Sequence, residues 1–387
     1  MMAVLTWSAR IVAALICAAI VIGVWKREEL VRVWNVITIF DEDRIVQNFS
    51  NMNAAFLTTT LPRGDGPVTP FSQGDTLALS PAAQDWIEEH RLTSLLVLKD
   101  GEIAYEGYFQ GTGADDRRIS WSLAKSYLSA LFGILLEEGA IRSLDAPVTE
   151  YVPLLAGGAY EGVSIRDVLM MSSGVVFDEE YANFSSDIQR MARVVALGGT
   201  LDAFTAEFTE RFAAPGEVWK YVSIDTHVIG MVIRGATGRS VSELMTEKII
   251  EPLGLEQDAY YVTDGTGVAY VLGGLNFSTR DYARFAQMFL NGGRVGDNQV
   301  VPEDWIKAST RPQAPTKEGA IGYGYQRWIP IGAEDGEYFG RGVYGQYLYI
   351  DESSDVVIVV TAADQAFRAP NVRQRNVKMM REIARSL

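Results

Sequence analysis

One serine in the chain is followed by a lysine at the spacing that brings two side chains together on a helix. Lys125 lies three positions after Ser122, and no other serine in the sequence has a lysine at that distance. Residues three apart on a helix share a face, with about 5–6 Å between their Cβ atoms, so the amine can reach the hydroxyl. A serine hydroxyl is a weak nucleophile, and a lysine desolvated in an apolar pocket can serve as its base. The pair is therefore a candidate for covalent catalysis.

The same serine also has a purely structural interpretation. Ser122 opens a long apolar-periodic stretch that predicts a helix over residues 122–139, and serine is a preferred N-cap residue. A helix N-terminus also favours the nucleophile hypothesis, because it offers free N–H groups and a positive field to a developing oxyanion. The chain has no Gly-x-Ser-x-Gly elbow, which argues against an α/β-hydrolase. The spacing by itself leaves both interpretations open.

Composition argues against several other kinds of function. The 387 residues are 48% hydrophobic, which is enough for a large core, and the formal net charge of -15 disfavours a nucleic-acid partner. No Cys/His cluster surrounds His90 or His227, so we expect no metal and no cofactor. His227 stands two residues after Asp225, but a triad role is disfavoured because Ser122 already has its lysine. Cys17 is the only cysteine, so an internal disulfide is excluded.

The elements around the serine predict an antiparallel sheet assembled from both ends of the chain. Residues 93–111 form a predicted hairpin that turns at Asp100-Gly101, and a second predicted hairpin near the C-terminus turns at residues 351–355. Further predicted helices cover residues 81–90, 165–171, 225–237, 241–250, 279–291 and 373–387. The expected fold class is α+β, with helices flanking the sheet and a mostly helical region inserted between the hairpins.

The N-terminal segment differs from the rest of the chain. Residues 11–25 carry no charge, and counted from Val4, with Arg10 reaching the interface, the segment approaches the ~20 residues that span a bilayer. A cleaved signal peptide is the alternative, but no small-x-small cleavage site precedes Lys26. We therefore predict a single transmembrane helix that contacts the lipid bilayer through residues 4–25.

The predicted organisation has three parts: an N-terminal membrane anchor over residues 1–27, a juxtamembrane helix and linker over residues 28–80, and a catalytic domain over residues 81–387. The middle part ends in a stretch rich in Pro, Gly, Ser and Thr, residues 57–80, which predicts an extended linker.

Several further strings occur in the order and spacing of a known family. They are IRSLDAPVTEYVP after the serine helix, the Ser-Ser-Gly stretch that ends at Gly174, PGEVWKYVSIDTHVIGMVIRGATG at residues 215–238, EPLGL at residues 251–255 and FGRGVYGQYLYID late in the chain. Together with Ser122-x-x-Lys125 they resemble the serine β-lactamase and penicillin-binding-protein superfamily, class C-like, over roughly residues 92–363. Within it the chain looks most similar to the 6-aminohexanoate-dimer hydrolases and related esterases.

The resemblance implies a role for each residue that matches a family motif. Ser122 would be the acylated nucleophile, Lys125 its base partner, and Tyr221 in Tyr-Val-Ser the group that carries a proton to the leaving group. A core tyrosine is the structural alternative for Tyr221. Ser223, at the last position of that motif, would orient the site. A hydroxyl does not offer the paired donor and acceptor of an Asn amide, which disfavours β-lactam recognition.

The Lys-Thr/Ser-Gly motif of the family is absent, and Gly340-Arg341-Gly342-Val343 stands in its place. Glycine permits close approach of a backbone to a substrate, so Gly342 is expected to line the substrate site. The implied oxyanion hole combines the N–H of Ser122 with that of Val343. Arg341 either replaces the missing lysine in binding a substrate carboxylate or is a solvated charge on the sheet edge.

Tyr181 resembles the tyrosine that touches the substrate amide in the aminohexanoate hydrolases. The acidic residues before it, Asp178, Glu179 and Glu180, either attract an amine-bearing substrate or form a solvated loop. The resemblance therefore implies a small amide or ester as the substrate.

Three functions follow from these observations. The preferred hypothesis is a membrane-anchored serine hydrolase that cleaves amide or ester bonds through an acyl-enzyme. A β-lactamase or D-Ala-D-Ala carboxypeptidase is the first alternative, and the absent Lys-Thr-Gly counts against it. The second is a catalytically idle scaffold bound to a membrane-protein partner, which the intact Ser122, Lys125 and Tyr221 disfavour.

The side of the membrane receives conflicting signals. Lys26 and Arg27 follow the apolar segment, which favours a cytoplasmic catalytic domain by the positive-inside rule. Penicillin-recognising relatives, in contrast, mostly work outside the inner membrane. We predict an inner-membrane protein with a periplasmic catalytic domain.

Overall fold

The computed structural model describes residues 7, 13, 16–17, 21, 24–25 and 27–387. Most of the predicted anchor, residues 4–25, lies outside these described residues. Within the described part of the chain, no helix is both long enough and apolar enough to cross a bilayer. This finding overturns the predicted inner-membrane, periplasmic localisation. The predicted contact with lipid and the predicted membrane-protein partner lose their support with it.

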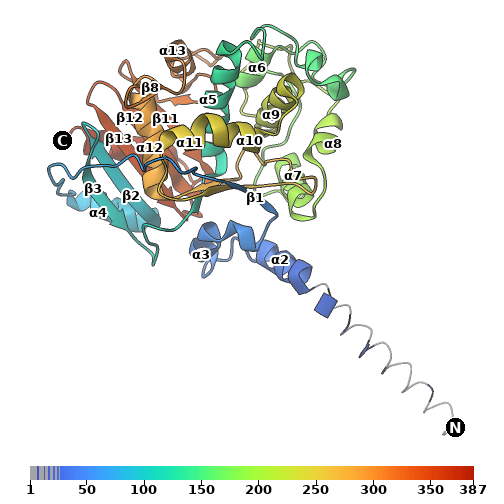
Figure 1. The fold of residues 1–387 in the computed structure, drawn as a ribbon, viewed down its shortest axis with the longest axis horizontal. Helices are drawn as coiled ribbons and strands as arrows, with labels where there is room; N and C mark the ends of the chain where they lie inside the picture. The colour runs from blue at the N-terminus through green and yellow to red at the C-terminus, as the bar shows by residue number, and fades with distance from the viewer. Residues whose placement is uncertain (1–6, 8–12, 14–15, 18–20, 22–23, 26) are drawn as a thin grey trace.

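A seven-stranded antiparallel sheet lies beside the mostly helical part of the molecule (Figure 1). Its strand order is β3-β2-β13-β12-β11-β10-β9. Its strands are β2 (Leu92–Lys99), β3 (Glu102–Tyr108), β9 (Gly322–Tyr323), β10 (Trp328–Ile329), β11 (Glu337–Gly342), β12 (Gln346–Asp351) and β13 (Val356–Ala362). The first hairpin pairs with the last, with Val97 opposite Ile358. The predicted sheet from both chain ends is therefore confirmed.

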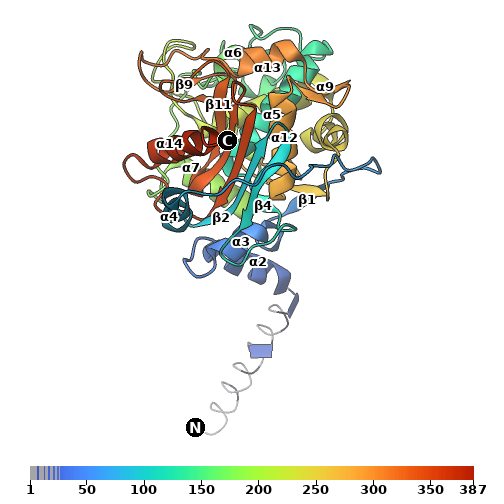
Figure 2. The ribbon, with the colours of Figure 1, turned by 90° about the vertical axis from the view of Figure 1, so that its left-hand side faces the viewer.

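Both faces of this sheet are covered, because apolar side chains alternate between them. On β2, Leu95 and Val97 pack on one face, and Leu96 and Leu98 pack on the other. The first face is covered by α4 (Pro81–Glu89) and α14 (Val372–Ala384), and the second by α5 (Ala124–Glu137) and α12 (Thr279–Leu290) (Figure 2). Burial on both faces explains the near-continuous apolar runs of the central strands.

Of the remaining helices, those over residues 165–169, 223–237 and 241–250 match predicted spans, whereas those over residues 187–196, 201–206, 251–253 and 303–309 were not predicted. In chain order these helices are α6 (Ile165–Leu169), α7 (Asp187–Ala196), α8 (Leu201–Ala206), α9 (Ser223–Thr237), α10 (Val241–Met245), a π-helical turn η5 (Thr246–Ile250), α11 (Glu251–Leu253) and α13 (Glu303–Ser309). Short 3₁₀ turns lie at η1 (Met52–Ala54), η3 (Val148–Glu150) and η4 (Pro153–Leu155), and a small hairpin joins β7 (Arg294–Val295) to β8 (Asn298–Gln299). The N-caps Ser164 and Ser240 each sit in a capping box, and Gly238 ends α9 at a φ of 65°.

The segment before the predicted catalytic domain packs against it. It holds α2 (Arg27–Ile37), α3 (Ile45–Ser50) and β1 (Thr58–Leu61), and β1 joins β5 (Ala259–Val262), β6 (Leu275–Phe277) and β4 (Arg118–Ile119) in the order β1-β5-β6-β4. The stretch predicted as an extended linker therefore contains a paired strand, since three β-branched threonines favour extended pairing. Ile45 and Phe49 are fully buried in a core cluster with Ile119 and Leu272. The three-part domain division stays a prediction.

Candidate active site

Ser122 lies in a single 3₁₀ turn, η2 (Trp121–Leu123), directly before α5. Leu123 occupies the N-cap position of α5, and no side chain caps that helix. Ser122 is therefore not the N-cap of α5. Its hydroxyl accepts a hydrogen bond from Lys125 Nζ, with 2.9 Å between the two atoms.

Lys125 is buried on the first turn of α5, with only 2% of its surface exposed. Its amine also donates to the carbonyl oxygen of Leu272 over 2.8 Å. Burial lowers the pKa of Lys125 to about 7, and the negative charge of Glu179 opposes part of that shift. An amine with this pKa is substantially neutral at neutral pH, so it can accept the proton of the Ser122 hydroxyl.

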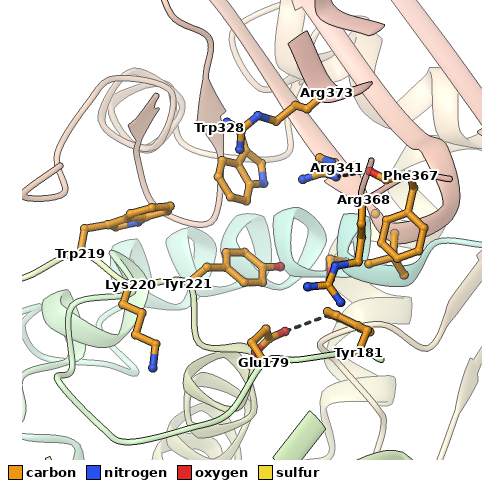
Figure 3. A pocket seen from close by; sticks show the side chains of 13 residues that line it. Glu179, Tyr181, Trp219, Lys220, Tyr221, Trp328, Arg341, Phe367, Arg368 and Arg373 are labelled. Carbon is orange, nitrogen blue, oxygen red and sulfur yellow. Dashed lines mark hydrogen bonds between the residues drawn. The ribbon is translucent and has the colours of Figure 1, made fainter. Parts of the chain in front are cut away.

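Tyr221 approaches the same point, with its ring centroid 5.4 Å from Lys125 Nζ. Burial raises the pKa of Tyr221 and the charge of Glu179 raises it further, while a hydrogen bond with Ser122 opposes the shift. The ring stacks on Trp328, with 5.3 Å between the centroids (Figure 3). The phenol is therefore protonated at neutral pH, and it is held where it can donate that proton.

Glu179 belongs to this site, although the sequence presented it only as one of three adjacent acids. Its carboxylate accepts hydrogen bonds from the Ser223 hydroxyl (2.6 Å), the Ser223 N–H (3.0 Å) and the Tyr181 hydroxyl (2.9 Å; Figure 3). The same charge acts on the pKa values of both Lys125 and Tyr221. A run of acids carries no signal for which member turns inward, so sequence reasoning could not single it out.

Strand β11 brings Gly342 and Val343 against the turn that holds Ser122. A Cβ atom at Gly342 would lie only 2.4 Å from the carbonyl oxygen of Ser120, so no side chain fits where the strand passes that turn. Val343 follows in the short turn η6 (Val343–Gly345), and it lines the same cavities as Ser122. The two backbone segments of the predicted oxyanion hole therefore lie together.

One residue beside Ser122 and one beside Val343 have a left-handed backbone conformation. Trp121, before Ser122, has a φ of 44°, and Tyr344, after Val343, has a φ of 60°. Such conformations cost energy for non-glycine residues and persist where the surroundings enforce them. Here the enforcing contacts are aromatic, since Phe40 stacks on Tyr344 with 5.2 Å between ring centroids and lies 6.0 Å from Trp121.

A cavity of about 420 Å³, here called the polar cavity, opens at Ser122 on the side of Tyr221 (Figure 3). Besides these two it is lined by Glu179, Tyr181, Trp219, Lys220, Trp328, Arg341, Gly342, Val343, Phe367, Arg368 and Arg373. Arg341 is half-buried in its wall and donates to the carbonyl oxygen of Phe367 over 3.4 Å. Trp328, Arg368 and Arg373 were not predicted as site residues, because only the tertiary fold brings their segments to the site. Trp219 and Lys220 directly precede Tyr221, but their residue types gave no signal for a catalytic role.

Both histidines lie away from this cavity. His227 Nε2 is 2.8 Å from Asp202 Oδ1, and His90 Nδ1 is 2.8 Å from Asp364 Oδ2. Neither histidine lines the polar cavity. Over the described residues, no group of three or more His, Cys, Asp or Glu side chains is placed to hold a metal ion.

Fold and site together define a class of protein. The family model Beta-lactamase matches residues 85–377, and the chain belongs to this family as a serine hydrolase. The superfamily resemblance and the enzyme class predicted from the sequence are confirmed, and the scaffold alternative is set aside.

Individual relatives agree with this assignment. The 6-aminohexanoate-dimer hydrolase of Paenarthrobacter ureafaciens is 32% identical over 327 residues, which are 80% of this chain and 83% of the relative. A solved Bacillus anthracis structure, provisionally described as a 6-aminohexanoate-dimer hydrolase, matches with a TM-score of 0.81 at 24% identity, over 89% of this chain and 95% of its own. A D-stereospecific amidohydrolase from Streptomyces shares the fold with a TM-score of 0.55 at 20% identity, over 73% of this chain and 94% of its own.

Proposed function

We propose that the protein hydrolyses amide or ester bonds through an acyl-enzyme formed on Ser122. The observation that carries this proposal is the buried Lys125, whose amine lies 2.9 Å from Ser122 Oγ and whose pKa is lowered to about 7. The relative at 32% identity is a hydrolase of the 6-aminohexanoate dimer, and the Streptomyces protein is an amidohydrolase. Both names support a substrate with an amide bond.

The proposed reaction has two stages. Ser122 Oγ attacks the substrate carbonyl carbon while Lys125 Nζ accepts the hydroxyl proton, and the N–H groups of Ser122 and Val343 stabilise the oxyanion. Tyr221 then donates its proton to the leaving nitrogen or oxygen, the bond to that atom breaks, and Tyr221 recovers a proton from Lys125. In the second stage water gives a proton to Lys125 as its oxygen attacks the acyl carbon. The bond from that carbon to Ser122 Oγ then breaks, Lys125 returns the proton to Oγ, and the acid is released.

A β-lactamase or D-Ala-D-Ala carboxypeptidase activity has less support. Ser223 stands where an Asn amide would offer a donor and an acceptor, and its hydroxyl donates to Glu179. Arg341 stands in the place of the family lysine, with a guanidinium that donates to a backbone carbonyl. We therefore expect β-lactams to be poor substrates compared with linear esters and amides.

Intact-mass spectrometry after incubation with a fluorophosphonate tests the proposed nucleophile. We expect a single adduct on the wild type, none on Ser122→Ala and strongly slowed labelling of Lys125→Ala. Lys307→Ala is the control, because Lys307 is an exposed lysine on α13 that does not line this cavity, and this variant should label like the wild type. Absence of an adduct on folded wild-type protein would refute the acyl-enzyme.

A further inference from the structure

Ser122 also lines a second cavity of about 200 Å³. Its walls include Trp121, Ile188, Ala192 and Leu272. Tyr221 does not line this space, and none of the described residues that do is charged. The nucleophile therefore stands between a cavity with charged walls and an uncharged one, here called the apolar cavity, whose wall also carries hydroxyl groups such as those of Tyr181 and Ser223.

The apolar cavity adjoins a third one of about 290 Å³. The two have six lining residues in common: Phe40, Trp121, Gln189, Ala192, Tyr270 and Gly273. Further along, the walls are formed by side chains such as Ile39, Met52, Ile119 and Val262. We call the two adjoining cavities the apolar groove. It leads from Ser122 to the segment that precedes the matched family region.

Arg193 is the one charged side chain among the described residues that line the groove. Its guanidinium donates to the carbonyl oxygen of Phe184 over 2.8 Å and stacks over the Phe184 ring at 4.0 Å. No described carboxylate lines the groove. An ammonium group placed deep in the groove, beyond Tyr181 and Ser223 whose hydroxyls donate to Glu179, would lose hydration without contacting a carboxylate.

Tyr221 decides which half of a substrate enters which cavity. A group that protonates the leaving atom must face the leaving group, and Tyr221 lines the polar cavity but not the apolar groove. The leaving group therefore departs on the polar side, beside Arg341. The chain attached to the carbonyl carbon then points from Ser122 into the groove.

We propose that the apolar groove binds an extended aliphatic acyl chain, so that esters or amides of medium- and long-chain acids are the preferred substrates. This inference rests on the acyl-enzyme mechanism proposed above. A methylene that moves from water to an apolar wall raises the specificity constant by up to about fourfold. An acyl chain that ends in an amine is disfavoured for want of a carboxylate in the groove.

The test measures kcat/KM for p-nitrophenyl esters from acetate to dodecanoate. We expect a rise of at least about 100-fold between acetate and octanoate, as burial of the added methylenes implies. The 6-aminohexanoate ester should be at least about tenfold poorer than the hexanoate ester, because its ammonium group would lose hydration in the groove.

Two alanine-to-tryptophan variants test whether the preference for long acyl chains depends on the groove. Ala192 is exposed on α7 where the two parts of the groove meet, and in Ala192→Trp the octanoate-to-acetate ratio should fall at least about tenfold as the indole fills the junction. Ala82 is an exposed alanine on α4 that lines neither part, and Ala82→Trp should keep the wild-type ratio.

The outcomes separate this inference from the proposed function. Ser122-dependent turnover with a flat or falling chain-length profile would overturn the groove assignment and leave the acyl-enzyme intact. If no ester is turned over and no fluorophosphonate adduct forms, the acyl-enzyme fails. In that case, calorimetric titration of dodecanoate and acetate into Ser122→Ala tests whether the groove binds an aliphatic chain independently of catalysis. Binding of dodecanoate but not acetate, lost when Ala192→Trp is added, would support the groove assignment. Equally weak heats from both acids would reject it.

Discussion

At the scale of single residues, Lys125 couples the chemistry of the site to pH. Burial lowers its pKa to about 7, so its neutral, proton-accepting form becomes populated as the pH rises through that value. We predict that kcat/KM for a good ester rises between pH 6 and 8 with a midpoint near 7 and then levels off. Lys125→Arg, which stays charged, should lose activity throughout. A pH–rate profile that is flat from pH 5 to 9 would contradict the role of this lysine.

A second residue-scale prediction concerns Glu179. Its negative charge favours the protonated forms of both Lys125 and Tyr221. In Glu179→Gln that charge is gone, so the midpoint of the pH–rate profile should move to lower pH by a few tenths of a unit or more. Glu180→Gln is the matched control, because Glu180 pairs with Arg368 instead, and its midpoint should stay in place. A midpoint of Glu179→Gln that is unchanged or raised would exclude the electrostatic role.

At the scale of elements, we expect the close contact between β11 and the turn that holds Ser122 to fix the spacing of the two N–H groups of the predicted oxyanion hole. A methyl group at Gly342 meets the Ser120 carbonyl at 2.4 Å, so Gly342→Ala must push the two segments apart. We expect kcat to fall about 100-fold, the loss typical of one missing oxyanion donor. Gly113→Ala serves as the control, because a Cβ atom there meets nothing within 4 Å. Steady-state kinetics on both variants tests this prediction. Equal kcat values for Gly342→Ala and Gly113→Ala would show that catalysis does not depend on the close contact of the two segments.

Elements could be predicted from the sequence wherever their signal is local. Asp100-Gly101 predicts the first hairpin, and the spacing of Ser122 and Lys125 places the amine beside the hydroxyl. The inward turn of Glu179 could not be predicted, because the Ser223 donors that hold it come from a distant segment. The full lining of the polar cavity could not be predicted either, because strands β10 and β11, helix α14 and several loops meet there only in the complete fold.

At the scale of the whole molecule, the segment before the matched family region is part of the core. Composition alone predicts a juxtamembrane helix and a linker there, whereas Phe49 is fully buried against Trp121 and Tyr344, at 5.4 and 5.2 Å between ring centroids. Both partners flank the predicted oxyanion hole. The hydrolase therefore includes residues that precede residue 85, where the family match begins.

This arrangement predicts that one substitution affects stability and catalysis together. Phe49→Ala should cost about 3–5 kcal/mol of unfolding free energy and lower the kcat/KM of the folded protein about tenfold, since the backbones beside Ser122 lose their support. Phe132→Ala removes an equally buried ring on α5 that packs on Trp305, and it should cost similar stability with unchanged kcat/KM. Urea unfolding combined with kinetics tests this, and unaltered kcat/KM in Phe49→Ala would uncouple the segment from the site.

The pairing of the first hairpin with the last has a consequence for how the chain folds. β2 emerges early in synthesis, but its neighbour β13 comes near the C-terminus, with Val97 opposite Ile358. At roughly 5–20 residues per second, the ribosome leaves that edge of β2 unpaired for on the order of tens of seconds. Sequence-distant pairing of this kind also slows folding, because the loop must close before the contact forms. The nascent chain therefore exposes the unpaired edge of an apolar strand throughout that interval, and such an edge is a template for pairing with other chains.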